Sequence, residues 1–281
     1  MAGEPERARS AKGPQIERWP LSARILRRLS RPPGGADYPG GTQTHVGEHA
    51  LDFILRTVPG FLDMVRGKTV LDYGCGLGRQ VLAMKAAGAV RVVGYDPYPK
   101  FVDDRPEGVE FRSDLPRERY DVVLNSSSFE HLADPVRDFE TMRDLARERL
   151  VITWAEPFYS PTGSHMGFFT RVPWVNLLFP ERSVFLVRSL YRQDGARRYE
   201  EAGLGGALNR MTVARFEEIV RLHKRDMRVE FQRNYATRAL PLATAIPVMR
   251  ELLTSACTCV LSAPDRRTLM SGNSRGPRQS R

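Results

Sequence analysis

The feature that most constrains the fold is the stretch 69–79, which reads Thr-Val-Leu-Asp-Tyr-Gly-Cys-Gly-Leu-Gly-Arg. Its β-branched and apolar start predicts a buried strand, and Gly74, Gly76 and Gly78 at alternating positions predict a tight turn. Helical periodicity resumes at Gln80. This order is typical of open α/β sheets, which bind ligands at the carboxyl ends of their strands. Because glycine permits positive φ and close approach to the main chain, we expect a nucleoside at this turn.

A second apolar segment, 91–97, predicts a neighbouring strand that ends in an acid. Asp96 follows Gly74 by 22 positions, about the spacing at which nucleotide-binding folds place a carboxylate on the ribose hydroxyls. A helix cap is the alternative role for a lone acid here. A nicotinamide-binding turn needs Gly-x-Gly-x-x-Gly, and its last glycine would fall on Arg79. A hydride-transferring oxidoreductase is therefore the secondary interpretation.

Four motifs in order resemble those of class I S-adenosylmethionine-dependent methyltransferases. Residues 72–78 resemble the first motif, 94–97 the second and 111–116 the third. Residues 120–135 are similar to the fourth strand and following segment of the branch that contains the ubiquinone and menaquinone biosynthesis enzymes. The similarity covers residues 45–155 and reappears from Asn209 to the last apolar strand. Residues 163–169 and 172–180 resemble a segment of glycan and natural-product methyltransferases.

The resemblance implies a doubly wound α/β fold, with a mostly parallel seven-stranded sheet, an antiparallel last strand and an inserted cap. It implies S-adenosylmethionine as cofactor, with Asp96 on the ribose and Asp114 at the adenine amino group. The implied cofactor-binding residues are Asp72, Gly74, Cys75, Gly76, Gly78, Asp96, Pro97, Asp114, Asn125 and Ser126.

Composition shifts along the chain predict its organisation. We expect a basic tail and linker over 1–43, the methyltransferase domain over 44–264 and a basic disordered tail over 265–281. The segment 156–210 interrupts the alternation of strands and helices and is rich in aromatic residues, proline and glycine. We interpret it as a cap over the reactive methyl group that supplies an aromatic-lined pocket.

Hydrophobic periodicity predicts further elements around the motifs. These are helices over 44–58, 135–148, 211–223 and 242–253, and strands over 149–155, 228–234 and 258–262. His45 and His49 lie four positions apart on the first of these helices, but no carboxylate accompanies them at suitable spacing, and we predict no metal site.

The net charge of +10 is concentrated in the tails. Residues 1–31 carry a net +5 and residues 265–281 a net +4, so the body is nearly neutral. Neither tail interleaves aromatic residues with its charges, so we expect solvated tails and no nucleic-acid partner. Residues 19–31 form a basic amphipathic pattern that fits weak membrane-surface contact, packing on its own domain or a frayed tail.

The remaining composition favours a cytoplasmic protein. No apolar run reaches the roughly 18 to 20 residues that cross a bilayer, no secretory leader is visible, and three cysteines without zinc spacing fit a reducing compartment. We expect no obligate protein partner.

The chemistry that this implies is an in-line displacement at an already activated methyl carbon. Alignment alone can contribute roughly 7 to 11 kcal/mol, so catalytic residues are hard to predict. A hydroxyl acceptor on a small molecule, glycan or glycolipid would need a general base, for which His131 and His165 are candidates, each with a structural role as the alternative. A phenol or quinone acceptor, a catalytically silent binding module and, last, nucleic-acid methylation remain as alternatives.

Overall fold

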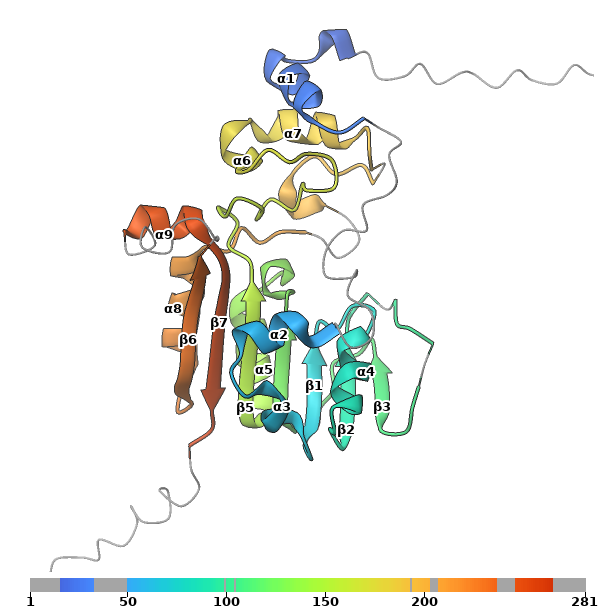
Figure 1. The fold of residues 1–281 in the computed structure, drawn as a ribbon, viewed down its shortest axis with the longest axis vertical. Coiled ribbons are helices and arrows are strands. Elements are labelled where there is room, and N and C mark those ends of the chain that lie inside the picture. Colours follow the sequence, from blue (N-terminus) through green and yellow to red (C-terminus); the bar gives the residue numbers. More distant parts are fainter. Residues whose placement is uncertain are drawn as a thin grey trace, which may run out of the picture.

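A computed structural model of the chain describes residues 16–32, 50–98, 100–103, 105–192, 194–202, 207–236 and 246–264. These residues form a seven-stranded sheet with helices on both faces, and a smaller cap beyond one end of the strands (Figure 1). The predicted linker over 33–43, the start of the predicted helix with His45 and His49, and the tail 265–281 lie outside the described residues.

The sheet has the strand order β3-β2-β1-β4-β5-β7-β6. Its strands are β1 (Thr69–Tyr73), β2 (Arg91–Tyr95), β3 (Val109–Arg112), β4 (Tyr120–Ser126), β5 (Ala146–Ala155), β6 (Arg228–Ala236) and β7 (Thr254–Ser262). β1 pairs in parallel with β2 and β4, whereas β7 runs antiparallel between β5 and β6. The predicted fold, a mostly parallel sheet with an antiparallel last strand, is confirmed.

The helices connect these strands and build the cap. They are α1 (Leu21–Leu29), α2 (Asp52–Thr57), α3 (Phe61–Val65), α4 (Arg79–Ala86), α5 (Pro135–Leu145), α6 (Val175–Leu178), α7 (Glu181–Arg188), α8 (Val213–His223) and α9 (Pro247–Leu253), with short 3-10 turns at Ile16–Arg18, Phe129–His131 and Tyr199–Glu201. Within the described part of the chain, no helix is both long and apolar enough to cross a membrane.

Local capping explains where two of these helices begin. The Asp134 side chain accepts a hydrogen bond from the Arg137 amide ahead of Pro135, and Thr212 does the same for the Arg215 amide of α8. The sequence-based boundaries were wrong at the other end of α5, which stops before Ala146 because Ala146 pairs with Tyr120 in β4. Likewise, β7 begins at Thr254 rather than at position 258.

Each face of the sheet has its own apolar core. Alternate residues of a strand point to opposite faces, so Leu71 of β1 packs with Phe139 of α5 and Phe216 of α8. Val70, its neighbour, packs on the other face with Met84 of α4, in the cluster that α2 and α3 complete. Burial of both strand faces explains why the central strands are nearly uniform in hydrophobicity.

The cap has a third core that includes the amino-terminal helix. Ala23 and Leu26 of α1 are fully buried in it, beside Val184 of α7 (Figure 1). Leu21 and Leu29 belong to the apolar side of the amphipathic pattern in 19–31, but they point outward and are 64% and 56% exposed. The helix therefore packs on its own chain through the small-residue side of its surface.

Four aromatic residues of the cap build a core of its own. Phe158, Phe169, Phe185 and Tyr199 are nearly inaccessible and pack on one another or their neighbours, with Phe158 and Tyr199 ring centroids 4.9 Å apart. A lobe of this size needs large apolar side chains for its core, so these four do not contribute to the aromatic-lined pocket that the sequence predicts.

Candidate active site

The glycine turn follows β1 and opens α4. Gly74, Gly76 and Gly78 have φ of 81°, 54° and 83°, the left-handed region that glycine adopts without strain. A Cβ at Gly74 would lie 2.6 Å from Oγ of Ser128, and one at Gly78 would lie 2.0 Å from Cε1 of Phe111. Any side chain at these two positions would collide, so the turn is bare main chain at the carboxyl end of β1.

Asp96 stands at the end of β2 and faces this turn. Its Oδ2 accepts a hydrogen bond from the Gly76 amide and its Oδ1 accepts one from the Tyr98 amide, each 2.9 Å long. A carboxylate has about four acceptor sites, so two sites remain for the hydroxyls of a ribose. Pro97, which follows, is exposed and belongs to the same turn.

Asp72 lies under the glycine turn, in β1. Its side chain is 1% exposed, and neither carboxylate oxygen has a hydrogen-bond partner in the structure. Burial, and then the charge of Asp96, raise the pKa of Asp72 to about 7. A buried carboxylate without donors fits a cationic ligand group such as the ammonium of methionine.

The end of β4 is tied to the same turn. The Asn125 amide donates to the Tyr73 carbonyl at 2.8 Å and to Oγ of Ser128 at 2.6 Å, while its own carbonyl oxygen is buried without a partner. Ser126, next to it, accepts a 3.5 Å hydrogen bond from the Gln80 side chain. These two predicted residues therefore lie at the carboxyl end of β4, beside the glycine turn.

The other predicted residues of this region lie around its rim. Cys75 packs against Gly94, whose Cβ would stand 2.8 Å from its sulfur, and burial raises the pKa of this thiol. Asp114 is exposed beyond the end of β3. The sequence analysis missed Phe111, which stacks on Phe101 with centroids 5.0 Å apart and covers the glycine turn.

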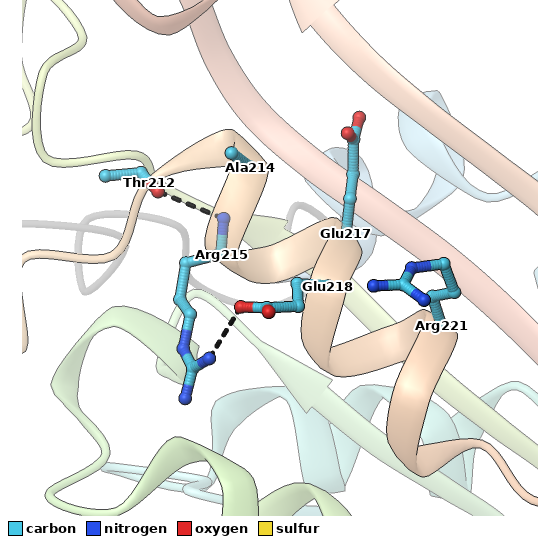
Figure 2. Close-up of a pocket in the computed structure, with 6 residues that line it drawn as sticks. All are labelled: Thr212, Ala214, Arg215, Glu217, Glu218 and Arg221. Atoms are coloured by element: carbon cyan, nitrogen blue, oxygen red, sulfur yellow. Dashed lines mark hydrogen bonds and ion pairs between the residues drawn. The ribbon is translucent and has the colours of Figure 1, made fainter.

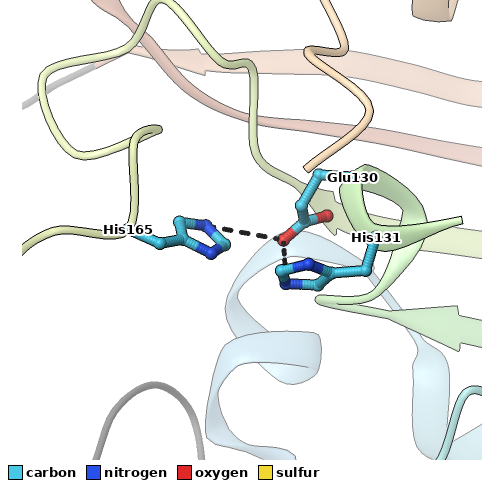
Figure 3. Close-up of side chains that lie close together, drawn as sticks. All are labelled: Glu130, His131 and His165. Carbon is cyan, nitrogen blue, oxygen red and sulfur yellow. Dashed lines mark ion pairs between the residues drawn. The ribbon is translucent and has the colours of Figure 1, made fainter. Parts of the chain in front are cut away.

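The two predicted catalytic histidines come together beyond the ends of β4 and β5. His131 follows β4 and His165 begins the cap, and their rings are 5.0 Å apart (Figure 3). Oε1 of Glu130 lies 4.0 Å from Nε2 of each ring. Glu156, the first residue after β5, accepts a 3.0 Å hydrogen bond from Nε2 of His165. We call these four residues the His-Glu cluster.

The two glutamates were missed at the sequence level. Glu130 is only 4% exposed and adjoins His131, and Glu156 directly follows an apolar strand. An acid at the carboxyl end of a parallel strand is a signal for a functional site, since ligands bind at that edge. The fold brings Glu130 and His165, which are 35 positions apart, to within 4.0 Å, and hydrophobic periodicity alone does not reveal such a contact.

Electrostatics divide the cluster into unequal members. Burial raises the pKa of Glu130 to about 7, and burial together with the charge of His165 lowers the pKa of His131 to about 4. Burial also disfavours the cationic form of His165, but the hydrogen bond to Glu156 outweighs it and raises the pKa of that histidine. His165 is therefore the stronger base of the pair.

Backbone strain accumulates at the same edge of the sheet. Ser127, Trp154 and His165 have φ of 52°, 56° and 55°, which non-glycine residues adopt only at a cost of about 1 to 3 kcal/mol each. Trp154 packs against Phe53 of α2, with ring centroids 4.9 Å apart and the ring planes tilted by 51°. Such strain persists where surrounding contacts hold side chains in place, as they do around these residues.

Two surface hollows lie away from the glycine turn. One, of about 570 Å³, runs along α8 and is lined by charged side chains, of which Arg215 and Glu218 pair with each other at 2.6 Å (Figure 2). The other, of about 260 Å³, lies in the cap beside His165 and is lined by Ser164, Met166, Arg171 and their neighbours. The second adjoins the His-Glu cluster and is the better candidate for part of an acceptor site.

The strand order, with its antiparallel insertion of β7, and the bare turn at the end of β1 define the fold of a class I S-adenosylmethionine-dependent methyltransferase. A family model described as "Methyltransferase domain" matches residues 43–192, more than half of the chain. The chain therefore belongs to this methyltransferase family, and S-adenosylmethionine is its cofactor.

Curated relatives match a shorter region. The chain is 30% identical over 106 residues to a tRNA U34 carboxymethyltransferase of Shewanella frigidimarina, which covers 32% of each protein. It is 31% identical over 104 residues to the Cellvibrio japonicus protein of the same name, covering 31% of each. The chain thus spans about a third of the length of the curated relatives it matches.

Solved structures match more of the chain at lower identity. An S-adenosylmethionine-dependent methyltransferase from Mesorhizobium loti is 17% identical, with 79% of this chain and 100% of that one covered and a TM-score of 0.49. Magnesium protoporphyrin IX methyltransferase from Synechocystis PCC 6803, crystallised with bound SAH, is 15% identical, with 77% and 83% covered and a TM-score of 0.47.

Proposed function

We propose that this protein transfers a methyl group from S-adenosylmethionine to a hydroxyl group of a small-molecule or glycan acceptor, and that His165 is the general base. The observation that carries the proposal is the hydrogen bond of 3.0 Å between His165 and Glu156, beside His131, at the carboxyl edge of the sheet. A base oriented by a carboxylate is what removal of a proton from an alcohol requires.

The cofactor residues have separate tasks in this proposal. Asp96 holds the ribose through its remaining acceptor sites, Asp72 faces the ammonium of the methionine part, and Gly74 to Gly78 let that part lie on the main chain. Asn125 and Ser126 lie beside the glycine turn at the end of β4, and we place Asp114 and Phe111 near the adenine of the cofactor.

A short segment connects the glycine turn to the His-Glu cluster, which supports this assignment. Residues 125–131 run from the carboxyl end of β4 to His131, and Oγ of Ser128 within this segment lies against Gly74. When bound, S-adenosylmethionine supplies a methyl carbon that is already electrophilic because it is attached to a sulfonium. His165 would take the hydroxyl proton of the acceptor, so that the acceptor oxygen could replace the sulfur on the methyl carbon.

A nucleic-acid acceptor is the second candidate, and the names of the curated tRNA-modifying relatives favour it. The matched region is about a third of those proteins. The aggregate charge of +10 is compatible with RNA contact through the tails.

An acceptor screen with isotope-labelled S-adenosylmethionine tests the proposal. We expect label in a sugar, phenol or lipid hydroxyl, and transfer reduced by at least about 100-fold in His165→Asn. His223→Asn is the matched control because His223 also pairs with a glutamate, Glu140, at 3.1 Å but lies on α8. Label in tRNA alone would favour the second candidate, and full turnover in both His165→Asn and His131→Asn would exclude either histidine as the base.

A further inference from the structure

The His-Glu cluster has the composition and convergence of a metal-binding site. Ligand atoms of Glu130, His131 and His165 all lie within 4.8 Å of one another, and Glu156 Oε2 lies 3.0 Å from Nε2 of His165. Glu130 and His131 come from the turn after β4 and His165 from the start of the cap (Figure 3), and Glu156 directly follows β5. Two imidazoles and two carboxylates are a common ligand set for divalent transition metals.

Hydrogen bonds outside the cluster fix which atoms face inward. Nδ1 of His131 donates to the Ala207 carbonyl at 3.1 Å. A carbonyl only accepts, so the neutral ring presents the lone pair of Nε2 to Glu130. Metal-bound histidines usually donate their other ring nitrogen to a carbonyl or carboxylate in this way.

The carboxylates are oriented in the same manner. Oε2 of Glu130 accepts a 3.3 Å hydrogen bond from the Glu156 amide, which leaves Oε1 directed at the two histidines. Oε1 of Glu156 accepts from the hydroxyls of Ser160 and Thr162, which leaves Oε2 at His165. Each glutamate thus uses one oxygen for the surrounding protein and offers the other to the cluster.

Inside the cluster, acceptor atoms outnumber donors. Glu130 Oε1, Glu156 Oε2 and His131 Nε2 are lone-pair atoms, and only His165 supplies a proton to them. Glu130 is almost completely buried, so water does little to satisfy its inward-facing oxygen. A bound cation would satisfy the three acceptors at once.

We propose that Glu130, His131, His165 and Glu156 bind one divalent transition-metal ion with mixed nitrogen and oxygen ligation, such as Zn²⁺, Fe²⁺ or Mn²⁺. Bonds of about 2.0 to 2.2 Å in a tetrahedral site place ligand atoms about 3.3 to 3.6 Å apart. The 3.0 Å separation between Glu156 and His165 is already within that distance, and the 4.0 Å separations from Glu130 to the two histidines would have to shorten by about 0.5 Å on binding. The ion takes the place of the proton on Nε2 of His165.

Binding of the ion stands on this geometry alone, whereas its use rests on the proposed function and changes the role of His165 within it. An imidazole bound through Nε2 carries its proton on Nδ1, so in the metal-loaded protein the ion, and not His165, would lower the pKa of the acceptor hydroxyl. The cap hollow lies next to the segment that carries His165, since Ser164 and Met166 line it.

Titration of metal-free full-length protein with Co²⁺ and Zn²⁺ tests the site without cofactor or acceptor. We expect one tight equivalent by calorimetry, visible Co²⁺ absorption of a site with nitrogen and oxygen ligands, and at least about 100-fold weaker binding in Glu130→Gln and His131→Gln. Thr162→Val, which removes only an orienting hydrogen bond, should weaken binding by about 10-fold.

Two controls separate this site from other histidines. His223→Gln removes a histidine of α8 that pairs with Glu140. A double variant, His45→Asn with His49→Asn, removes the two histidines that lie outside the described residues. Both should bind the metal as wild type does, and circular dichroism should show that every variant is folded. No binding by the wild type, undiminished binding by folded Glu130→Gln and His131→Gln, or loss of binding in the His45 and His49 variant would overturn the proposal. Metal binding without methyl transfer would refute the proposed function alone.

Discussion

Replacing Asp72 by asparagine should change how the stability of the free protein depends on pH. The side chain is 1% exposed, with both carboxylate oxygens unpaired, and burial followed by the charge of Asp96 raises its pKa from 3.8 to about 7. An acid with a raised pKa in the folded state stays protonated there after it has ionised in the unfolded chain. Stability is therefore highest at low pH and is lost as the pH rises through the folded-state pKa.

The magnitude follows from the difference between the two pKa values. Each tenfold change in proton affinity corresponds to about 1.4 kcal/mol, so the full loss is about 4 kcal/mol, of which about 3 kcal/mol falls between pH 5 and pH 8. Asp72→Asn keeps the shape and removes the titration. The free energy of unfolding of the variant relative to wild type should thus increase by about 3 kcal/mol over this interval.

Urea denaturation at several pH values measures this difference directly. Asp63→Asn is the matched control, because Asp63 is exposed and pairs only at the surface with Arg66. Its curve of unfolding free energy against pH should parallel that of wild type. A difference between wild type and Asp72→Asn that does not vary with pH would refute the reasoning that burial controls this carboxyl.

Three further substitutions test other parts of the structure. Gly78→Ala should destabilise the protein by about 1 to 3 kcal/mol and weaken cofactor binding, because its Cβ would meet Phe111 at 2.0 Å. Gly67→Ala, with φ of 70° and open space around its Cβ, should destabilise it less when both variants are compared by thermal denaturation. Thr153→Val should lower the free energy of unfolding by about 1 to 3 kcal/mol, since Oγ1 of Thr153 is hydrogen-bonded to the buried hydroxyls of Thr57 at 2.6 Å and Thr258 at 3.0 Å. An unchanged midpoint in urea denaturation would show that these bonds add nothing to stability. Asp194→Asn should cost about 2 to 3 kcal/mol by the same assay, because Arg188, 4% exposed, loses the carboxylate that it contacts through both terminal nitrogens at 2.5 Å; the charge-conserving Asp194→Glu should cost less.

The central part of the fold was predictable because its signals are local. A strand, three glycines and a helix within 69–79 depend on neighbouring residues alone, and Asp96 is placed by the end of the next strand. The end of α5 was not predictable in this way, since Ala146 continues the helical pattern of the sequence but pairs with Tyr120 of β4 in the sheet. Tertiary pairing outweighs intrinsic propensity at such boundaries.

Two residues of the His-Glu cluster were named from the sequence, but their arrangement was not. His131 and His165 were each chosen separately, and only the packed cap reveals that they meet and that Glu130 and Glu156 join them. Arg188 gives another example, since its side chain is buried against Asp194 in the cap, a pairing that the sequence pattern does not predict. Sequence distance hides such contacts because they depend on how two lobes fold back together.

Calorimetric titration of S-adenosylmethionine and its demethylated product into wild type and Asp96→Ala tests the central claim most directly. Two hydrogen bonds from ribose hydroxyls to a carboxylate are worth roughly 1.5 to 3 kcal/mol each, so we predict at least about 100-fold weaker binding in the variant, with Asp63→Ala like wild type. Equal affinity in Asp96→Ala and wild type, or no binding of either ligand to wild type, would contradict a cofactor held between the ends of β1 and β2.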